Sequence, residues 1–501
     1  MSQLLRPGAT QEKSEEARTS FLVGAISVSN TVKSTLGPRG MLKLLYTSKG
    51  EPIITNDGAT VLKNIVPNGP SAKILINSAQ EHGENEGDGT TTLTVLTGEL
   101  LQEADRLIFK GTHPYRVISA YRKAHLQAIA RLRQLSHTAE RYEDKLNLAK
   151  TTLSSKFSPM ELQSLAELAV KVSETVVEID MISVVKLAGG EVSDSYVDEG
   201  LLLECEIGPG QNTAMDNPRV LIVNTAMDTD KVKIFGAKAS VTSPKELGRL
   251  EEAEKQKMSE KVASIAAHAD VIVNRQIIYD YPTQEFTRLG KMSIERADFT
   301  GVEMLARVLS GRILSTFGSV QPSDVGHCRR VERVKLSNRT FTRFSGVPST
   351  GACTIVIRGP SKEILEEAER SLIGAIKVLK GNTQEYVYGG GSAEAAVSCA
   401  ITPESEGERA FSRALLEVAR ILAENAGHNP DDTIDTILRK NKEGVFTWGV
   451  GAEGAQCMEG VLVKESLRLK EIIWTRAAEV TEMLLRCDGI IRCKPRERVQ
   501  E

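Results

Sequence analysis

Apolar residues recur at helical spacing through most of the first 135 positions. Between residues 19 and 36, apolar side chains lie three or four positions apart, and the pattern stops at Gly37-Pro38, as helices commonly do. The same spacing predicts helices over residues 71–79, 90–109 and 115–135. Residues 51–58 form a short apolar run that ends in an Asn-Asp-Gly turn, which predicts a strand. The N-terminal part is therefore predicted to be mainly helical.

The pattern changes near residue 190 to short apolar runs separated by helical stretches. Strands are predicted over residues 201–203, 220–223, 271–273 and 353–357, and a helix over residues 363–379. Another helix, over residues 244–268, begins with Ser243 at its cap, Pro244 in its first turn and Glu246 three positions after the cap. Its charged segment, residues 251–257, is interpreted as a solvated helix face. Alternating strands and helices indicate an α/β unit.

After the run Gly389-Gly390-Gly391 the chain returns to helical spacing, over residues 409–425 and 467–487. Helical ends around an α/β middle predict a nested layout, in which one domain is built from both ends of the chain and another is inserted into it. The predicted fold class is therefore a multidomain α+β protein.

Composition narrows the classes of function. The 501 residues suggest about three domains at about 150 residues each. Lys and Arg number 63 against 66 Asp and Glu, a net charge of −3, whereas proteins that bind nucleic acid through phosphate neutralisation normally carry a basic excess. The chain has no run of 18 apolar residues, so no membrane-spanning helix is predicted. The first residues do not have the pattern of a secretory signal. Nucleic acid and membrane are therefore not expected as partners.

The seven cysteines are scattered and none forms a Cys-x-x-Cys pair. This argues against a zinc site or a disulfide framework and is typical of the reducing cytosol. The histidines show no metal-binding spacing and are interpreted as structural or exposed. A nucleophile elbow is also lacking.

The strongest candidate for chemistry is Gly87-Asp88-Gly89-Thr90-Thr91-Thr92, directly before a predicted helix. Glycines allow close approach of the backbone, and the free amides of a helix start attract anions. Threonine hydroxyls add donors, and Asp88 could hold Mg²⁺ beside the phosphates. The alternative is a glycine-rich helix cap without a ligand.

Two more glycine loops, residues 35–40 and 389–391, lie next to helices in the same predicted domain. Each alone is explained by a helix cap or a turn, but together they favour a shared phosphate or nucleotide pocket. The chain has neither a P-loop sequence nor a strand followed by Gly-x-Gly-x-x-Gly, so such a pocket would use neither arrangement. Asp57 could supply a second carboxylate, although a turn aspartate is the commoner explanation.

Longer runs carry a resemblance to a known family. The chain resembles group II chaperonin subunits nearly end to end, and residues 227–236 and 274–282 are similar to one subunit type of the eukaryotic cytosolic chaperonin. The other runs that carry the likeness are residues 35–41, 55–65, 87–91, 151–156 and 194–200.

The resemblance implies a fold and partners. A helical equatorial domain would comprise residues 1–137 and 383–501 and bind ATP. An intermediate hinge domain would comprise residues 138–205 and 350–382, and an α/β apical domain with a lid protrusion, residues 206–349, would bind unfolded clients. The helix around residues 294–305 would face clients with polar and apolar groups, a solvated face being the alternative. The assembly implied is a cytoplasmic double ring of different subunits, eight per ring, that folds proteins such as actin and tubulin.

The resemblance also implies roles for single residues. Asp88 would hold Mg²⁺, and Asp57 would be the catalytic residue that positions or activates the attacking water. The residues implied in ATP binding are Gly37, Gly89, Thr90, Thr91, Thr92, Ser154, Ser155, Lys156, Gly390, Gly391, Glu465 and Lys470. Of these, residues 154–156 would sense the γ-phosphate, and Glu465 and Lys470 would lie near the ribose and base.

One departure from the family pattern concerns hydrolysis. Family members carry a water-activating aspartate after a Glu-Arg-Ser-Leu stretch, but here Gly374 occupies that place, and no aspartate occurs between Gly351 and Asn382. Loss of a general base costs about two to four orders of magnitude in rate. Because glycine also weakens a helix by about 1 kcal/mol relative to alanine, helix stability does not explain the replacement.

Three functions are compared on this basis. The favoured one is ATP-dependent protein folding within a hetero-oligomeric chaperonin, with slow hydrolysis at this subunit. The second is a structural ring subunit that binds ATP without hydrolysing it. The third, a metabolic kinase or synthetase, would need an acid–base site for a small substrate, which the sequence does not offer.

Overall fold

The computed structural model describes residues 10–46, 52–67, 69–198, 200–227, 243–316, 320–348, 352–381 and 385–492. The chain divides into two compact units: residues 1–170 with 366–501, and residues 171–365. The first unit is thus built from both ends of the chain and the second is inserted into it. Several helices and sheets in each unit confirm the multidomain α+β class. The three-domain boundaries stay a prediction.

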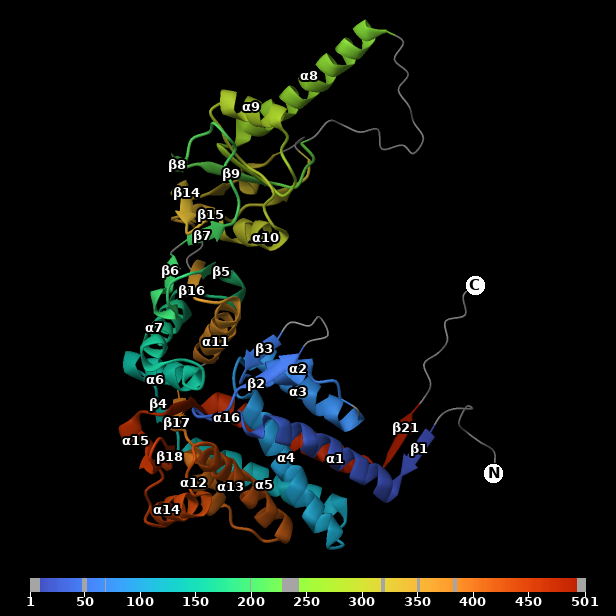
Figure 1. The fold of residues 1–501 in the computed structure, drawn as a ribbon, viewed down its shortest axis with the longest axis vertical. Helices are drawn as coiled ribbons and strands as arrows, with labels where there is room; N and C mark the ends of the chain where they lie inside the picture. The colour runs from blue at the N-terminus through green and yellow to red at the C-terminus, as the bar shows by residue number, and fades with distance from the viewer. Residues whose placement is uncertain are drawn as a thin grey trace. The chain divides into compact units, whose positions relative to one another are not determined.

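The first unit is mainly helical (Figure 1). Two of its helices, α7 (Pro159–Thr175) and α11 (Lys362–Lys380), continue across the boundary between the units. The other helices of this unit are α1 (Ser14–Lys33), α2 (Gly58–Asn64), α3 (Pro70–Glu86), α4 (Thr90–Phe109), α5 (Pro114–Gln134), α6 (Tyr142–Leu153), α12 (Ser392–Ala400), α13 (Glu406–Asn425), α14 (Pro430–Lys442), α15 (Met458–Val461) and α16 (Leu467–Arg486).

Helix α4 forms the centre of this bundle. Leucines and small residues alternate around it, and nearly every side chain from Leu93 to Leu101 is buried. A helix that is buried on nearly all sides has to be surrounded by other elements, and α1, α13 and α16 pack around α4. The central position fixes the N-terminal end of α4, where the Gly-Asp-Gly-Thr sequence lies.

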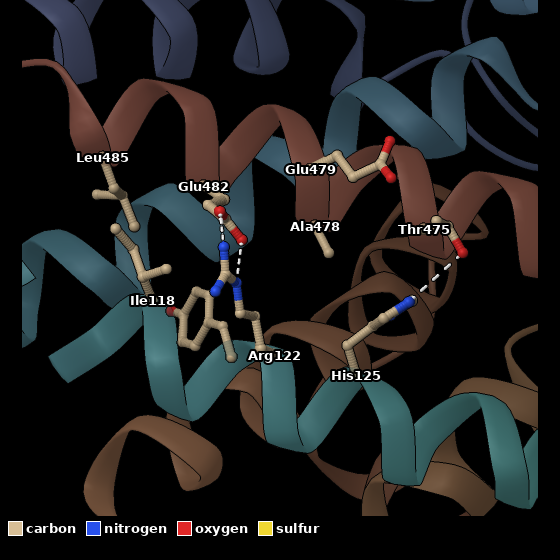
Figure 2. Close-up of a pocket in the computed structure, with 9 residues that line it drawn as sticks. Ile118, Arg122, His125, Thr475, Ala478, Glu479, Glu482 and Leu485 are labelled. Carbon is tan, nitrogen blue, oxygen red and sulfur yellow. Dashed lines mark hydrogen bonds and ion pairs between the residues drawn. The ribbon is translucent and has the colours of Figure 1, made fainter. Parts of the chain in front are cut away.

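Helices α5 and α16 pack beside each other over a small cavity (Figure 2). On its rim, the guanidinium of Arg122 donates two hydrogen bonds to the carboxylate of Glu482. Nε2 of His125 lies 3.4 Å from the hydroxyl of Thr475. Trp474, on the same helix as Thr475, is fully buried in the core. The exposed ion pair adds little by itself, so burial of apolar groups carries this contact.

Short strands complete the first unit. Strand β1, from the start of the chain, pairs antiparallel with β21, from its end, and the two lie side by side (Figure 1). Strands β2 and β3 form a hairpin, β18 and β19 form another, and β20, β17 and β4 form a three-stranded sheet. The bounds are β1 (Thr10–Lys13), β2 (Lys43–Tyr46), β3 (Pro52–Thr55), β4 (His137–Thr138), β17 (Glu385–Tyr388), β18 (Trp448–Gly451), β19 (Gly454–Cys457), β20 (Lys464–Ser466) and β21 (Gly489–Arg492).

The described residues of the second unit form three sheets. In the first, β11, β10, β9 and β12 run parallel and β13 pairs antiparallel with β9. The second has the order β7-β15-β14-β8, and the third the order β5-β16-β6. The strands are β5 (Ile182–Ala188), β6 (Tyr196–Asp198), β7 (Gly200–Leu203), β8 (Ala214–Asp216), β9 (Arg219–Val223), β10 (Val271–Asn274), β11 (Met292–Ile294), β12 (Ile313–Leu314), β13 (Gly326–His327), β14 (Arg330–Leu336), β15 (Arg339–Ser345) and β16 (Cys353–Gly359).

Three helices accompany these sheets: α8 (Pro244–His268), α9 (Asp280–Arg288) and α10 (Phe299–Val308). Helix α8 has the predicted bounds. The helix expected around residues 294–305 is wrong at its start, because Ile294 ends β11 and Asp298 caps α10 through a hydrogen bond to the amide of Gly301. A β-strand register and an Asx cap override the helical spacing here.

Within the described residues, no helix has the length and apolarity to span a membrane. Most of residues 227–236, one of the two runs that are similar to one subunit type, lie outside the described residues.

Candidate functional site

The residues singled out in the sequence surround one cavity in the first unit. Its volume is about 520 Å³. All fourteen predicted residues line it: Gly37, Asp57, Asp88, Gly89, Thr90, Thr91, Thr92, Ser154, Ser155, Lys156, Gly390, Gly391, Glu465 and Lys470. They come from segments more than 430 positions apart in the chain, so only the fold could show that they share a site.

Four helices begin at the wall of this cavity. Their N-cap residues are Asp57 for α2, Gly89 for α4, Gly391 for α12 and Ser466 for α16, and all four line the cavity. The side chains of Asp57 and Ser466 cap their own helices. Glycine caps make no such bond, so the first amides of α4 meet no capping side chain and are left for an anion. In α12 the amide of Ser392 donates to the carbonyl of Gly389 at 3.2 Å. The arrangement suits the phosphates of a nucleotide.

Gly89 needs to be glycine for two reasons. Its φ of 81° lies in the left-handed region, and an added β-carbon would lie 2.4 Å from Cδ1 of Ile473. Across the loop, a β-carbon on Gly58 would lie 2.5 Å from the hydroxyl oxygen of Thr91. Gly89 therefore lets α16 approach the start of α4, whereas Gly58 lets the Asp57 loop approach it, which brings the second carboxylate to the phosphate loop.

Asp57 is held as an anion at this junction. Its carboxylate accepts hydrogen bonds from the amide and the hydroxyl of Thr60, at 2.9 and 2.7 Å. Lys156 lies 4.0 Å away. Burial raises the pKa of Asp57, but Lys156 and Thr60 outweigh burial and hold the pKa below its usual value. An ionised carboxylate beside a phosphate site can accept a proton from water.

Lys156 follows α6 in a segment tied to the Asp57 loop. The side-chain amide of Asn56 donates to the carbonyl of Ser155 at 2.7 Å. The ammonium of Lys156 also lies 3.5 Å from the carboxylate of Glu367, on α11. The ammonium is therefore placed between two carboxylates, one from each side of the site.

Asp88 fits the role of a magnesium ligand. Its side chain accepts a hydrogen bond from the amide of Gly89 at 2.7 Å. Burial raises the pKa of Asp88 despite the nearby Lys156, a cost that a bound cation would remove. Among the described residues, no three His, Cys, Asp or Glu side chains gather as a metal cage. Because Mg²⁺ usually takes one or two carboxylates with water and phosphate oxygens, a single aspartate is sufficient for a shared nucleotide–Mg²⁺ site.

A buried charge cluster closes the other end of the cavity. The ammonium of Lys470 pairs with the carboxylate of Glu394 and, at 2.7 Å, with that of Glu465. Burial opposes the charge on Lys470, but the two carboxylates raise its pKa above the usual value. Burial raises the pKa of Glu465. Apolar side chains, including Leu422, Val450 and Ile473, line the space beside the cluster, which suits a flat base with polar edges.

Gly374 lies against the phosphate loop. A β-carbon added to Gly374 would lie 2.6 Å from the carbonyl oxygen of Gly87, which caps the C-terminus of α3 with a φ of 84°. One turn on, the ammonium of Lys377 donates to the carbonyl of Glu84 at 2.7 Å. Close packing of α11 on the end of α3 thus explains a glycine that helix propensity does not. An aspartate at position 374 would force the two backbones apart in this arrangement.

Sequence reasoning missed several polar side chains at or beside the cavity, among them Glu394, Glu367 and His82. Glu394 lines it, Glu367 contacts Lys156, and His82 lies buried behind Gly89 with Nδ1 3.2 Å from Arg476. Burial, with Arg476, lowers the pKa of His82 to about 4, so its ring is neutral. Glu394 follows the third glycine loop by three positions, a signal that could have been used. Nothing in the local sequence marks His82 or Glu367.

Comparison with known proteins identifies the family of this chain. Residues 28–495 match the TCP-1/cpn60 chaperonin family. The chain belongs to this family. It is 41% identical over 517 residues to T-complex protein 1 subunit beta of Saccharomyces cerevisiae, covering 99% of this chain and 98% of that protein. Identity to T-complex protein 1 subunit beta of Homo sapiens is 40% over 526 residues, covering 99% and 97%. The resemblance to group II chaperonins is thereby confirmed.

The identities also support the subunit type suggested by residues 274–282. A third relative, T-complex protein 1 subunit beta of Encephalitozoon cuniculi, is 40% identical over 511 residues and is covered to 98%. This chaperonin chain therefore spans nearly the full length of relatives from a yeast, a mammal and a microsporidian. Roles for individual cavity residues remain proposals, because the comparisons do not address them.

Proposed function

We propose that this chain is an ATP-binding subunit of a cytoplasmic, hetero-oligomeric double-ring chaperonin with eight subunits per ring. In this proposal ATP binding closes a lid around unfolded clients such as actin and tubulin. The observation that carries it is the single cavity, at which two uncapped helix starts, Asp88, Asp57 and Lys156 converge. Family membership and the beta-type relatives support the assembly.

Within the cavity, each group has one task. The amides and hydroxyls of residues 89–92 hold the phosphates, with Mg²⁺ shared between them and Asp88. Lys156 balances charge at the terminal phosphate, and Asp57 orients or deprotonates the attacking water. Glu465 and Lys470 lie beside the ribose and base.

Hydrolysis at this subunit is proposed to be slow. Gly374 supplies no carboxylate where the family pattern has an aspartate, so Asp57 acts without it. The expected loss is about two to four orders of magnitude. Nucleotide binding is retained, because the phosphate loop and Asp88 are intact. The alternative, a ring subunit that binds ATP without hydrolysing it, is favoured by the same Gly374 and opposed by the ionised Asp57.

Single-turnover hydrolysis by the assembled ring tests this function, with Gly374→Asp introduced in this chain only. Because any side chain at 374 meets the Gly87 carbonyl, Gly374→Ala is the matched steric control. We expect the aspartate variant to hydrolyse ATP faster than both the natural chain and the alanine variant. Equal rates in all three would contradict the assignment of Gly374, and failure of the natural chain to bind ATP would contradict the function itself.

A further inference from the structure

Glu367 is a carboxylate of α11 that contacts Lys156, a charged side chain that lines the cavity. It lies seven positions before Gly374, so the two share a face of the helix, two turns apart. Glu367 itself does not line the cavity, and its side chain is 15% exposed. It can therefore act on a bound nucleotide only through the residues it holds.

Glu367 is fixed by its own helix. One oxygen pairs with Arg370 at 2.6 Å, one turn along, and the hydroxyl of Ser371 lies 3.5 Å from the other. Such contacts three and four positions apart restrict the side chain to one orientation. That orientation aims the carboxylate at two targets outside α11.

The first target is the ammonium of Lys156, 3.5 Å away. Asp57 lies 4.0 Å from the same ammonium on its other side. The second target is Thr55, at the end of β3, whose hydroxyl donates to Glu367 at 3.0 Å and accepts from the backbone amide of Asp57 at 3.0 Å. Glu367 thus touches both the cation of the phosphate site and the support of its catalytic loop.

We propose that Glu367 is a positioning residue that restrains Lys156 beside Asp57, weakens its attraction for the terminal phosphate and steadies the Asp57 loop, so that α11 acts on this site without a carboxylate at position 374. The inference rests on the proposed function, because it assigns regulation to the same nucleotide site. The charge of Glu367 decides whether its removal raises or lowers the affinity for ATP. An ammonium shared by two carboxylates attracts a phosphate less than one shared by a single carboxylate.

The isosteric change Glu367→Gln separates this role from a merely structural one. It removes the charge but keeps the shape. Lys156 is then freed to meet the phosphate, and we expect affinity for Mg·ATP to rise on the order of tenfold, as expected for unit charges a few ångströms apart in a partly buried site. The single-turnover rate should fall, because Thr55, which supports the Asp57 loop, loses its charged hydrogen-bond acceptor. A structural defect would lower affinity and rate together.

Two further variants make the test specific. Glu363→Gln removes the same charge from the exposed first turn of α11 and should leave affinity and rate unchanged. In a Lys156→Met background, Glu367→Gln should no longer raise ATP affinity, since the cation through which it acts is gone. Glu367→Asp, which keeps the negative charge, should retain part of the single-turnover rate that Glu367→Gln loses.

Titration of the purified full-length chains with a fluorescent ATP analogue, followed by quenched single turnover, gives both quantities. Higher affinity with a lower rate, lost in the Lys156→Met background, supports the proposal. Unchanged or lower affinity in Glu367→Gln, or an equal effect with and without Lys156, overturns it. If the natural chain binds no analogue, the proposed function fails instead, so the two failures are distinguishable.

Discussion

The phosphate loop and helix α11 meet where Gly87 lies against Gly374, and they contribute opposite things to the site. The loop offers amides, hydroxyls and the Asp88 carboxylate, a complete set for holding phosphates and Mg²⁺. Helix α11 offers a glycine at its point of closest approach and a carboxylate two turns away. One side is therefore equipped to bind, whereas the other contacts the site without a group that touches the reacting atoms.

This difference separates binding from hydrolysis. Binding depends on uncapped helix starts, which follow from Gly89 and Gly391. In the proposed function, hydrolysis depends on a carboxylate at the attacking water, a role assigned to Asp57. A subunit of this kind would bind ATP and hydrolyse it slowly. Its hydrolysis would then not set the timing of the ring's cycle.

The largest effect should come from Asp57→Asn. Asparagine caps a helix about as well as aspartate, so α2 is preserved while the last general base is lost. We expect single-turnover hydrolysis to fall by about two orders of magnitude or more, with ATP affinity little changed. Quenched-flow measurement on the full-length chain checks both. A rate equal to that of the natural chain would show that another group activates the water.

Asp88→Asn should have the next largest effect, on the binding side of the comparison. We expect affinity for ATP in the presence of Mg²⁺ to fall about ten- to a hundredfold, the loss typical of a damaged metal site. Without Mg²⁺ the affinity should not fall, since one negative charge beside the phosphates has been removed. Calorimetric titration with and without Mg²⁺ checks this, and equal losses under both conditions would contradict the metal assignment.

Lys156→Met should change the pH dependence. Burial raises the pKa of Asp57, and Lys156 is the largest of the groups that lower it. Without that ammonium the pKa of Asp57 rises, so the base is protonated at higher pH. The acidic limb of the single-turnover profile should therefore move to higher pH. An unmoved limb would mean that Asp57 is not the titrating base.

Gly374→Ala should have the smallest effect, on stability. Helix propensity alone predicts a gain of about 1 kcal/mol in the free energy of unfolding. Contact of the new methyl group with the Gly87 carbonyl, 2.6 Å away, should cancel that gain. Urea unfolding of the full-length chain, compared with the natural one, provides the measurement. A full 1 kcal/mol of stabilisation would show that α11 does not pack as tightly as the structure indicates.

Local patterns predicted the fold well where burial and capping agree. Helix α4 has the predicted bounds because Gly89 marks its start and its apolar residues recur at helical spacing up to Phe109. The helix expected from residue 294 failed, since the strand Met292–Ile294 is specified by pairing with a distant strand, Val271–Asn274. Register of that kind is set by tertiary contacts, which a local pattern does not contain.

The residues of the candidate site also divide into those that the sequence marks and those that it does not. Glycine loops and Asp88 stand out in the sequence because their chemistry is local. The contact of Glu367 with Lys156 joins residues 211 positions apart, and Gly374 and Gly87 are 287 positions apart. The resemblance could indicate that an aspartate was missing. Only the packing of α11 shows that Gly374 permits close contact with the carbonyl of Gly87.

The measurement that tests the central claim most directly follows the fate of bound nucleotide. The natural full-length chain is loaded with radiolabelled Mg·ATP, free nucleotide is removed, and bound ATP and ADP are quantified over time. We predict stoichiometric binding, with the label leaving mainly as unhydrolysed ATP. Conversion of most bound ATP to ADP before any release would contradict the account, because the site would then hydrolyse efficiently without a carboxylate at position 374.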